Sequence, residues 1–126
     1  MKNTPKSTTD FTKITAILGD YFEGLYHADV EQLTAIFHPH SQLIAPGNRR
    51  SVKKWLTDVA SRDVPAKLHQ PFNFEILAID VVQDQAMAKV KCPLFDFNYI
   101  DFLGLLKEDG QWRIISKMYT DIKDKT

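Results

Sequence analysis

The spacing of apolar residues changes near residue 72, and this change constrains the fold more than any other feature of the sequence. Before it, apolar side chains recur every three to four residues, the period of an amphipathic helix; after it they alternate, the period of a half-buried strand. Helices followed by a run of strands predict an α+β domain in which N-terminal helices pack on an antiparallel sheet.

The first predicted helix begins near Asp10, a candidate N-cap. Its apolar stripe would consist of Ile14, Ile17, Leu18, Tyr21, Phe22 and Leu25. The polar residues before it indicate a frayed tail at residues 1–9. We therefore expect a single domain over residues 10–123.

Two shorter helices are predicted next. Asp29 would cap the first of them, with Gln32 in the capping-box position, and Pro39 would end it. A strand at Ser41–Ala45 would then close on a Pro-Gly turn. Ser51 would cap the last helix, whose buried face would be Val52, Trp55, Leu56 and Val59.

Four strands are predicted after a loop at residues 61–71, over residues 72–82, 85–92, 94–107 and 111–122. Asp109-Gly110 between the last two is a strong hairpin signal, because a type I′ turn needs positive φ at both central residues. A two-residue loop sets the register, so Leu105 would lie beside Ile114 and Phe102 opposite Lys117.

In this unbroken register both faces of the last hairpin are largely apolar, with Asp101 on one face and Lys117 and Tyr119 on the other. The helices can cover only one face, so we expect a homodimer through the other face of the sheet. A bulge at Gly104 would instead bring Asp101 to the face of Lys117 and Tyr119. Both arrangements remain open at this point.

Composition excludes several classes of function. The chain has 16 basic and 16 acidic residues, so no net charge attracts nucleic acid or an anionic membrane. No apolar run is long enough for a membrane span, and no signal peptide is recognisable. The single cysteine, Cys92, excludes an internal disulfide. We expect a cytoplasmic protein.

Two stretches resemble one known family. The segment from Tyr26-His27-Ala28-Asp29 to Phe37-His38-Pro39 is similar to a passage of the putative lumazine-binding (SnoaL-like) branch of the nuclear transport factor 2-like superfamily. The segments 101–107 and 109–115, with Lys117, resemble the closing hairpin of that branch. The resemblance implies a cystatin-like cone, with helices covering the concave face of a curved antiparallel sheet. His40 departs from it, since the branch often has an acidic residue there.

The fold alone does not select a chemistry, because the superfamily includes isomerases, dehydratases, cyclases, ligand binders and dimerisation modules. We expect a small, flat organic ligand in the cone and no cofactor. One alternative is a cofactor-independent isomerase, dehydratase or cyclase, with Asp101 or His40 as the base and Lys117 or Tyr119 as the oxyanion donor. Another is a dimerisation module with a vestigial pocket.

The predicted ligand-binding residues are aromatic or interrupt an apolar strand: Tyr21, Tyr26, Phe37, Trp55, Phe97, Tyr99, Asp101, Lys117 and Tyr119. Lys117 cannot be buried without a partner, since desolvation of its charge costs on the order of several kcal/mol. It must reach solvent at the rim, pair with a carboxylate, or face a cavity that holds an anionic or carbonyl group. We predict the last.

Three further clusters carry weaker signals. His38 and His40 are close, but zinc needs three or four ligands, so no metal site is predicted. Four cations lie near the start of the third helix, at Arg49, Arg50, Lys53 and Lys54. They could attract a phosphate, although such clusters are more often solvated surface. Nothing near Cys92 indicates a nucleophilic thiol.

Overall fold

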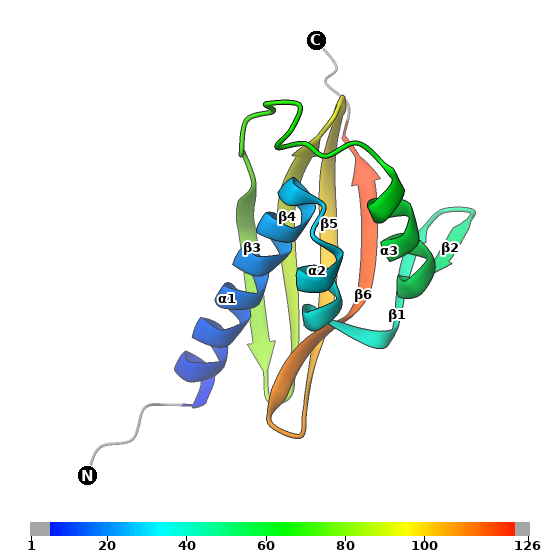
Figure 1. Cartoon of the computed structure of the whole chain (residues 1–126). Coiled ribbons are helices and arrows are strands. Elements are labelled where there is room, and N and C mark those ends of the chain that lie inside the picture. Colours follow the sequence, from blue (N-terminus) through cyan, green and yellow to red (C-terminus); the bar gives the residue numbers. More distant parts are fainter. Residues whose placement is uncertain (1–5, 123–126) are drawn as a thin grey trace.

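A computed structural model describes residues 6–122, and in it three helices pack on one face of a six-stranded sheet (Figure 1). The helices are α1 (Lys6–His27), α2 (Val30–Ile36) and α3 (Val52–Ser61). The strands are β1 (Phe37–Ala45), β2 (Asn48–Ser51), β3 (Glu75–Val82), β4 (Gln85–Leu94), β5 (Phe97–Glu108) and β6 (Gln111–Asp121).

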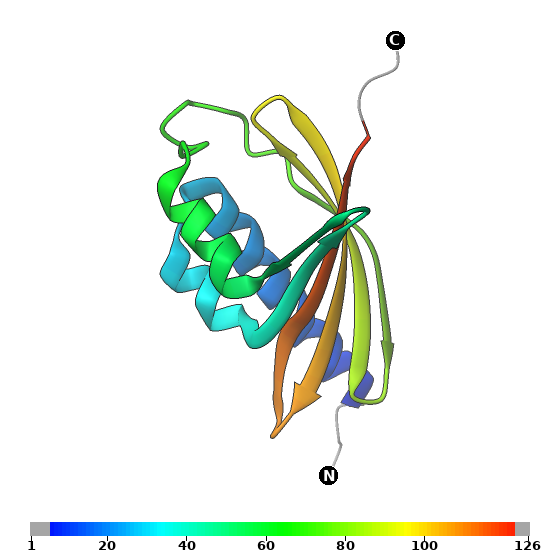
Figure 2. The ribbon, with the colours of Figure 1, turned by 90° about the vertical axis from the view of Figure 1, so that its right-hand side faces the viewer.

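The strand order is β2-β1-β6-β5-β4-β3. Every neighbouring pair is antiparallel except β1 and β6, which run parallel, so the sheet is mixed rather than purely antiparallel. With that difference, the predicted α+β fold is confirmed. Figure 2 shows the sheet edge-on, with the helices on one side of it. No helix in the described residues is long and apolar enough to cross a membrane.

The hydrophobic core lies between the helices and the inner face of the sheet. The predicted stripe of α1 is turned inward, with Ile14, Leu18, Tyr21, Phe22 and Leu25 buried. They meet buried residues of the strands, among them Val90, Leu103, Leu105 and Ile114. The apolar stripe of the helix and the inward-facing residues of the alternating strands therefore pack against each other in one interface.

Helix α1 begins at Lys6, so the prediction that Asp10 is its N-cap is wrong. Asp10 is a buried residue inside the helix, and its carboxylate accepts hydrogen bonds from Lys107 Nζ and Trp112 Nε1, both at 3.1 Å. These bonds tie α1 to the last hairpin and lower the pKa of Asp10, the Trp112 bond most of all. Of the predicted tail, residues 6–9 are helical and residues 1–5 lie outside the described residues.

The predicted cap residues of the two shorter helices are confirmed, but the capping box is not: the Gln32 side chain donates to Asp20, and the Asp29 N–H donates to Gly24 O. Asp29 Oδ1 accepts from the backbone N–H of Gln32 at 3.1 Å, and Ser51 Oγ accepts from that of Lys54 at 3.0 Å. Each satisfies a donor that the first turn leaves free. The sequence thus placed both helix starts correctly.

The end of α2 differs from the prediction. The helix ends at Ile36, before Pro39, which stands inside β1. Phe37 already has extended backbone and pairs with Ile114 of β6. Tertiary pairing with β6 therefore ends the helix, and the predicted strand Ser41–Ala45 is the second half of a longer one.

Strand β2 was not predicted. The turn that precedes it was, and Gly47 has the positive φ of +74° that such a turn requires. β2 then pairs antiparallel with β1, with Ile44 opposite Arg49. The sequence Asn-Arg-Arg-Ser has no apolar alternation, because this short strand lies at the edge of the sheet and buries little.

The hairpin between β5 and β6 forms at the predicted turn. Asp109 and Gly110 have φ values of +52° and +76°. Glu108 pairs with Gln111, and the register continues as predicted as far as Leu105 beside Ile114.

Beyond Leu105 the register shifts by one residue. Gly104 pairs with Ser116 and Leu103 with Lys117, so the predicted pairing of Phe102 with Lys117 is wrong. A Cβ at Gly104 would lie 2.6 Å from Ser116 Oγ, which shows how closely the bulged strand approaches this glycine.

The bulge decides which side chains share the inner face. Asp101 pairs with Tyr119, and Leu103 pairs with Lys117. Directly opposed residues in an antiparallel pair point to the same side, so Asp101, Lys117 and Tyr119 all face the helices. Of the two arrangements left open by the sequence, the bulged one is present.

The outer face of the sheet exposes large apolar side chains, including Val82, Met87 and Met118. A groove of about 360 Å³ also lies there. Its lining residues are Ile44, Ala45, Pro46, Arg49, Phe102, Met118, Tyr119 and Thr120.

Candidate functional site

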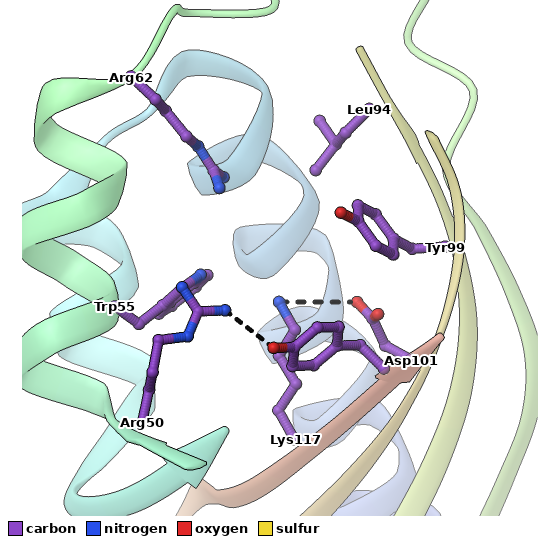
Figure 3. Close-up of a pocket in the computed structure, with 8 residues that line it drawn as sticks. Arg50, Trp55, Arg62, Leu94, Tyr99, Asp101 and Lys117 are labelled. Carbon is purple, nitrogen blue, oxygen red and sulfur yellow. Dashed lines mark hydrogen bonds and ion pairs between the residues drawn. The ribbon is translucent and has the colours of Figure 1, made fainter. Parts of the chain in front are cut away.

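A cavity of about 50 Å³ lies between α3, β2 and the inner face of the sheet (Figure 3). Its lining residues come from five elements and one connection: Arg50 of β2, Trp55 of α3, Arg62 just after α3, Leu94 of β4, Tyr99 and Asp101 of β5, and Lys117 and Tyr119 of β6. A volume of this size holds a few water molecules or a small organic group.

Asp101 is the carboxylate of the cavity and is 1% exposed. Its Oδ2 accepts a hydrogen bond of 2.6 Å from the hydroxyl of Tyr21 and lies 3.9 Å from Lys117 Nζ. Its Oδ1 is buried and accepts no hydrogen bond. Buried carboxylate oxygens normally have partners. The Cys92 thiol, whose pKa Asp101 helps to raise, is one neighbouring donor, and a donor on a bound molecule would be another.

Tyr21 holds this carboxylate from α1. It is fully buried, and burial raises its pKa well above the usual range, with a further contribution from the Asp101 carboxylate. Tyr21 therefore remains a neutral hydroxyl and a hydrogen-bond donor. It supports Asp101 from behind and is not part of the cavity lining.

Lys117 is 8% exposed and lines the cavity. Its ammonium lies 4.5 Å from the ring centre of Trp55, 5.4 Å from that of Tyr21 and 5.8 Å from that of Tyr119. Burial lowers its pKa, and Asp101 partly opposes that change. Lys117 thus both pairs with a carboxylate and faces a cavity, two of the arrangements considered from the sequence.

Two arginines complete the cationic side of the cavity. Arg50 donates to Asp58 Oδ2 and to the hydroxyl of Tyr119, both at 3.1 Å. Arg62 has its Nε buried without a hydrogen-bond partner, and burial lowers its pKa. In Figure 3 its side chain extends from the end of α3 into the cavity.

The hydroxyl of Tyr119 accepts from Arg50 Nη2 and from Asn48 Nδ2, both at 3.1 Å. With its oxygen occupied as an acceptor, its proton is free to be donated elsewhere. Tyr99 stands on the opposite wall from Trp55 (Figure 3). Burial raises the pKa of Tyr99, so it too is a neutral donor.

Of the nine predicted ligand-binding residues, five lie at the cavity: Trp55, Tyr99, Asp101, Lys117 and Tyr119. The others lie elsewhere. Tyr26 donates to the backbone oxygen of Gln70, Phe37 is buried against Trp55 and Tyr21, and Phe97 is 45% exposed and stacked on Tyr99.

The remaining candidates lie away from the cavity. His40 is exposed, and its backbone N–H donates to His38 Nδ1 at 3.0 Å. Between residues 6 and 122, no three His, Cys, Asp or Glu side chains gather as a metal site would require. Cys92 is buried, and burial raises the pKa of its thiol, which disfavours the thiolate.

Reasoning from the sequence missed Arg62 and left Arg50 in a surface cluster. In the structure Arg50 reaches the cavity and Lys54 is exposed, and both pair with Asp58, at 3.1 Å and 3.0 Å. A signal for Arg62 was present, because it follows Val59 by three positions and so continues the inward face of α3.

The family described as "Putative lumazine-binding" matches this chain over residues 9–120. A protein described as NTF2-like and of unknown function, from Shewanella baltica, has 22% identity and a TM-score of 0.83, over 97% of this chain and 100% of that one. A similar protein from Methylobacillus flagellatus has 25% identity and a TM-score of 0.70, over 88% and 90%.

An uncharacterised protein with a cystatin-like fold from Caulobacter vibrioides has 19% identity and a TM-score of 0.63, over 90% of this chain and 89% of that one. These structural likenesses concern the fold. No curated protein matches the chain.

Proposed function

We propose, from the premise that this chain belongs to the putative lumazine-binding family, that it binds a small organic molecule in the cavity between its helices and its sheet. The observation that supports this most is the set of unpaired polar atoms among the lining residues: Asp101 Oδ1, Arg50 Nε and Arg62 Nε. Buried polar atoms normally have partners. A ligand with both donors and acceptors would supply them.

The size of the cavity limits what it can hold. Its volume is about 50 Å³, whereas pockets for drug-sized ligands have about 300–1,000 Å³. A small molecule, or one edge of a flat ring, fits between Trp55 and Tyr99. A larger ring would require Arg62 and Leu94, on one wall, to move outward. Arg62 is the first residue of the connection between α3 and β3, outside both elements.

Tryptophan fluorescence tests the proposal directly. The chain has two tryptophans, and Trp112→Phe leaves Trp55, a lining residue, as the only reporter. Lumazine and small organic acids and amides are titrated into this variant, after circular dichroism shows that it is folded. We expect saturable changes that Leu94→Phe abolishes by filling the cavity. Titrations without any change, or changes unaffected by Leu94→Phe, contradict the proposal and favour a dimerisation module with a vestigial pocket.

A second candidate is an enzyme that moves a proton without a cofactor. It is favoured by Asp101 Oδ1, a buried carboxylate oxygen that accepts no hydrogen bond, in a cavity that the cations Lys117 and Arg62 also line. Asp101 would take the proton, and the cations would stabilise the resulting negative charge. Exchange of carbon-bound protons of small carbonyl compounds for deuterium, followed by NMR, tests this. A catalyst loses the exchange on Asp101→Asn; a binding protein shows none.

We further propose that the protein is a homodimer formed through the outer face of the sheet. The groove of about 360 Å³ and the exposed side chain of Met118 lie on that face. A chain without net charge does not repel its own copy. A stable symmetric pair would bury on the order of 1,500 Å² in total.

A further inference from the structure

The cavity contains more positive than negative charge. Its lining residues include three cations, Arg50, Arg62 and Lys117, and one carboxylate, Asp101. Arg50 has a counterion outside the lining, Asp58 at 3.1 Å, which it shares with Lys54, and Lys117 pairs with Asp101 at 3.9 Å. Of the three cations that line the cavity, Arg62 alone has no ion pair within residues 6–122.

Arg62 has donors to spare. A guanidinium carries five N–H donors, and across residues 6–122 its side chain donates none of them in a hydrogen bond. Its guanidinium carbon lies 5.7 Å from the ring centre of Phe95. Its Nε is buried, and Figure 3 shows the group directed into the cavity. Arg62 as a whole is half-buried, so its cation is partly desolvated, and a partly desolvated cation is stabilised by an anion beside it.

The donors and the size of the cavity together favour one kind of anion. A guanidinium offers two parallel N–H groups that match two oxygens of a carboxylate or of a phosphate, and a cavity of about 50 Å³ favours the smaller, planar carboxylate. The hydroxyl of Tyr119, whose oxygen already accepts from Arg50 and Asn48, adds a single donor at the same cavity. Asp101 does not oppose a second carboxylate strongly, because Tyr21 and Lys117 already hold its charge at 2.6 Å and 3.9 Å.

We infer that the ligand of this cavity is a small organic carboxylate whose oxygens are bound by Arg62, with Tyr119 and Lys117 beside it. This inference rests on the proposed function and narrows it to one class of ligand. It predicts that charge on the ligand matters more than its shape.

Arginine side-chain NMR tests the inference at the atom concerned. The chain has four arginines, so each Nε–H signal can be assigned with single variants. Propionate and benzoate are titrated at constant ionic strength beside their neutral amides, propionamide and benzamide. In at least one pair we expect the acid to bind about tenfold or more tightly than its amide and to shift the Arg62 signal.

Three variants complete the experiment. Arg62→Met should weaken binding of the acid about tenfold or more, and Arg62→Lys, which keeps the charge without the paired donors, should lie between. Lys67→Met is the matched control, since Lys67 is exposed in the same connection and its loss removes the same charge. It should leave the affinity unchanged. If Arg62→Met does not fold, the affinity of Arg62→Lys for the acid is compared with that of wild type instead.

The possible failures are distinguishable. If neither acids nor amides bind, the proposed function itself is wrong. If amides bind as tightly as acids, or if Arg62→Lys binds as wild type does, the carboxylate inference alone is overturned. Equal weakening by Lys67→Met and the Arg62 variants shows only long-range attraction and overturns it as well.

Discussion

At the scale of single residues, Lys117 is the one cation among the buried polar residues of the described chain. An ammonium that is 8% exposed has lost most of its water, and its one carboxylate partner lies 3.9 Å away rather than in hydrogen-bond contact. Three aromatic rings compensate in part, each contributing about 0.5–2 kcal/mol in such contacts. The residue is tolerated because of these rings and the cavity beside them.

Burial of Lys117 predicts a measurable pH effect. Its pKa in the folded protein is lowered from 10.5, so above that lowered pKa and up to the ordinary value the unfolded chain binds more protons. The contribution of Lys117 to the free energy of unfolding therefore rises with pH through this window. It is lost as pH falls through the pKa of the folded state. Tyr21 and Cys92, whose pKa values burial raises, act in the opposite direction.

The comparison of wild type with Lys117→Met isolates that contribution. As pH is raised from neutral to about 10, the free energy of unfolding of wild type should increase relative to that of the variant. Urea unfolding at a series of pH values measures it. A difference that stays constant or shrinks would show that Lys117 is solvated in the folded state.

Two glycines give a second prediction, because their surroundings are equally open but their backbones differ. At neither would an added Cβ have a neighbour within 4 Å, yet Gly110 has a φ of +76° and Gly19 lies inside α1. Gly110→Val should destabilise by about 1–2 kcal/mol, since L residues resist the left-handed region. Gly19→Ala should stabilise by about 1 kcal/mol. Thermal unfolding measures both changes in stability. A Gly110→Val variant as stable as wild type would contradict the positive φ of the turn at Gly110.

At the scale of elements, the last hairpin shows what a sequence can and cannot predict. The turn and the first pairs follow from Asp109-Gly110, because local backbone preference decides them. The bulge could be named only as an alternative at Gly104, since a one-residue shift depends on curvature across several strands. That shift places Asp101 and Lys117 on one face, so the site depends on the least predictable step.

The same limit explains the other residues of the site. Trp55, Tyr99 and Lys117 are recognisable because each is aromatic or polar in an apolar pattern. Arg62 looks like an ordinary charged residue at a helix end, and its one sequence signal, the spacing of three from Val59, does not distinguish a cavity residue from a solvated one. Arg50 belongs to β2, an edge strand without an alternating pattern.

Engineered disulfides test the bulge. In the shifted register Phe102 is opposite Met118, and directly opposed Cα atoms lie about 4.5–5.5 Å apart, within disulfide range. Phe102→Cys with Met118→Cys should therefore oxidise within one chain, whereas Phe102→Cys with Lys117→Cys, the pair of the unbroken register, should not. Thiol titration of the folded variants, with non-reducing gels to exclude links between chains, decides between the registers.

At the scale of the whole molecule, the two faces of the sheet have different surroundings. The inner face is covered by three helices, and the outer face exposes apolar side chains over β3, β4 and β6. Large exposed apolar patches usually mark an interaction site. A second copy is the simplest partner for such a face, because a symmetric pair lets it cover itself.

The homodimer predicts a mass in solution twice the chain mass of 14.5 kDa, measured by light scattering at micromolar concentration. Met118→Glu should give a monomer or an aggregate, because it would bury a charge in the interface without a partner. Phe11→Glu is the matched control: Phe11 is 49% exposed and Met118 50%, but Phe11 lies on α1, on the helical side of the sheet. A wild-type mass near 14.5 kDa, or equal effects of the two substitutions, would contradict pairing through the outer face.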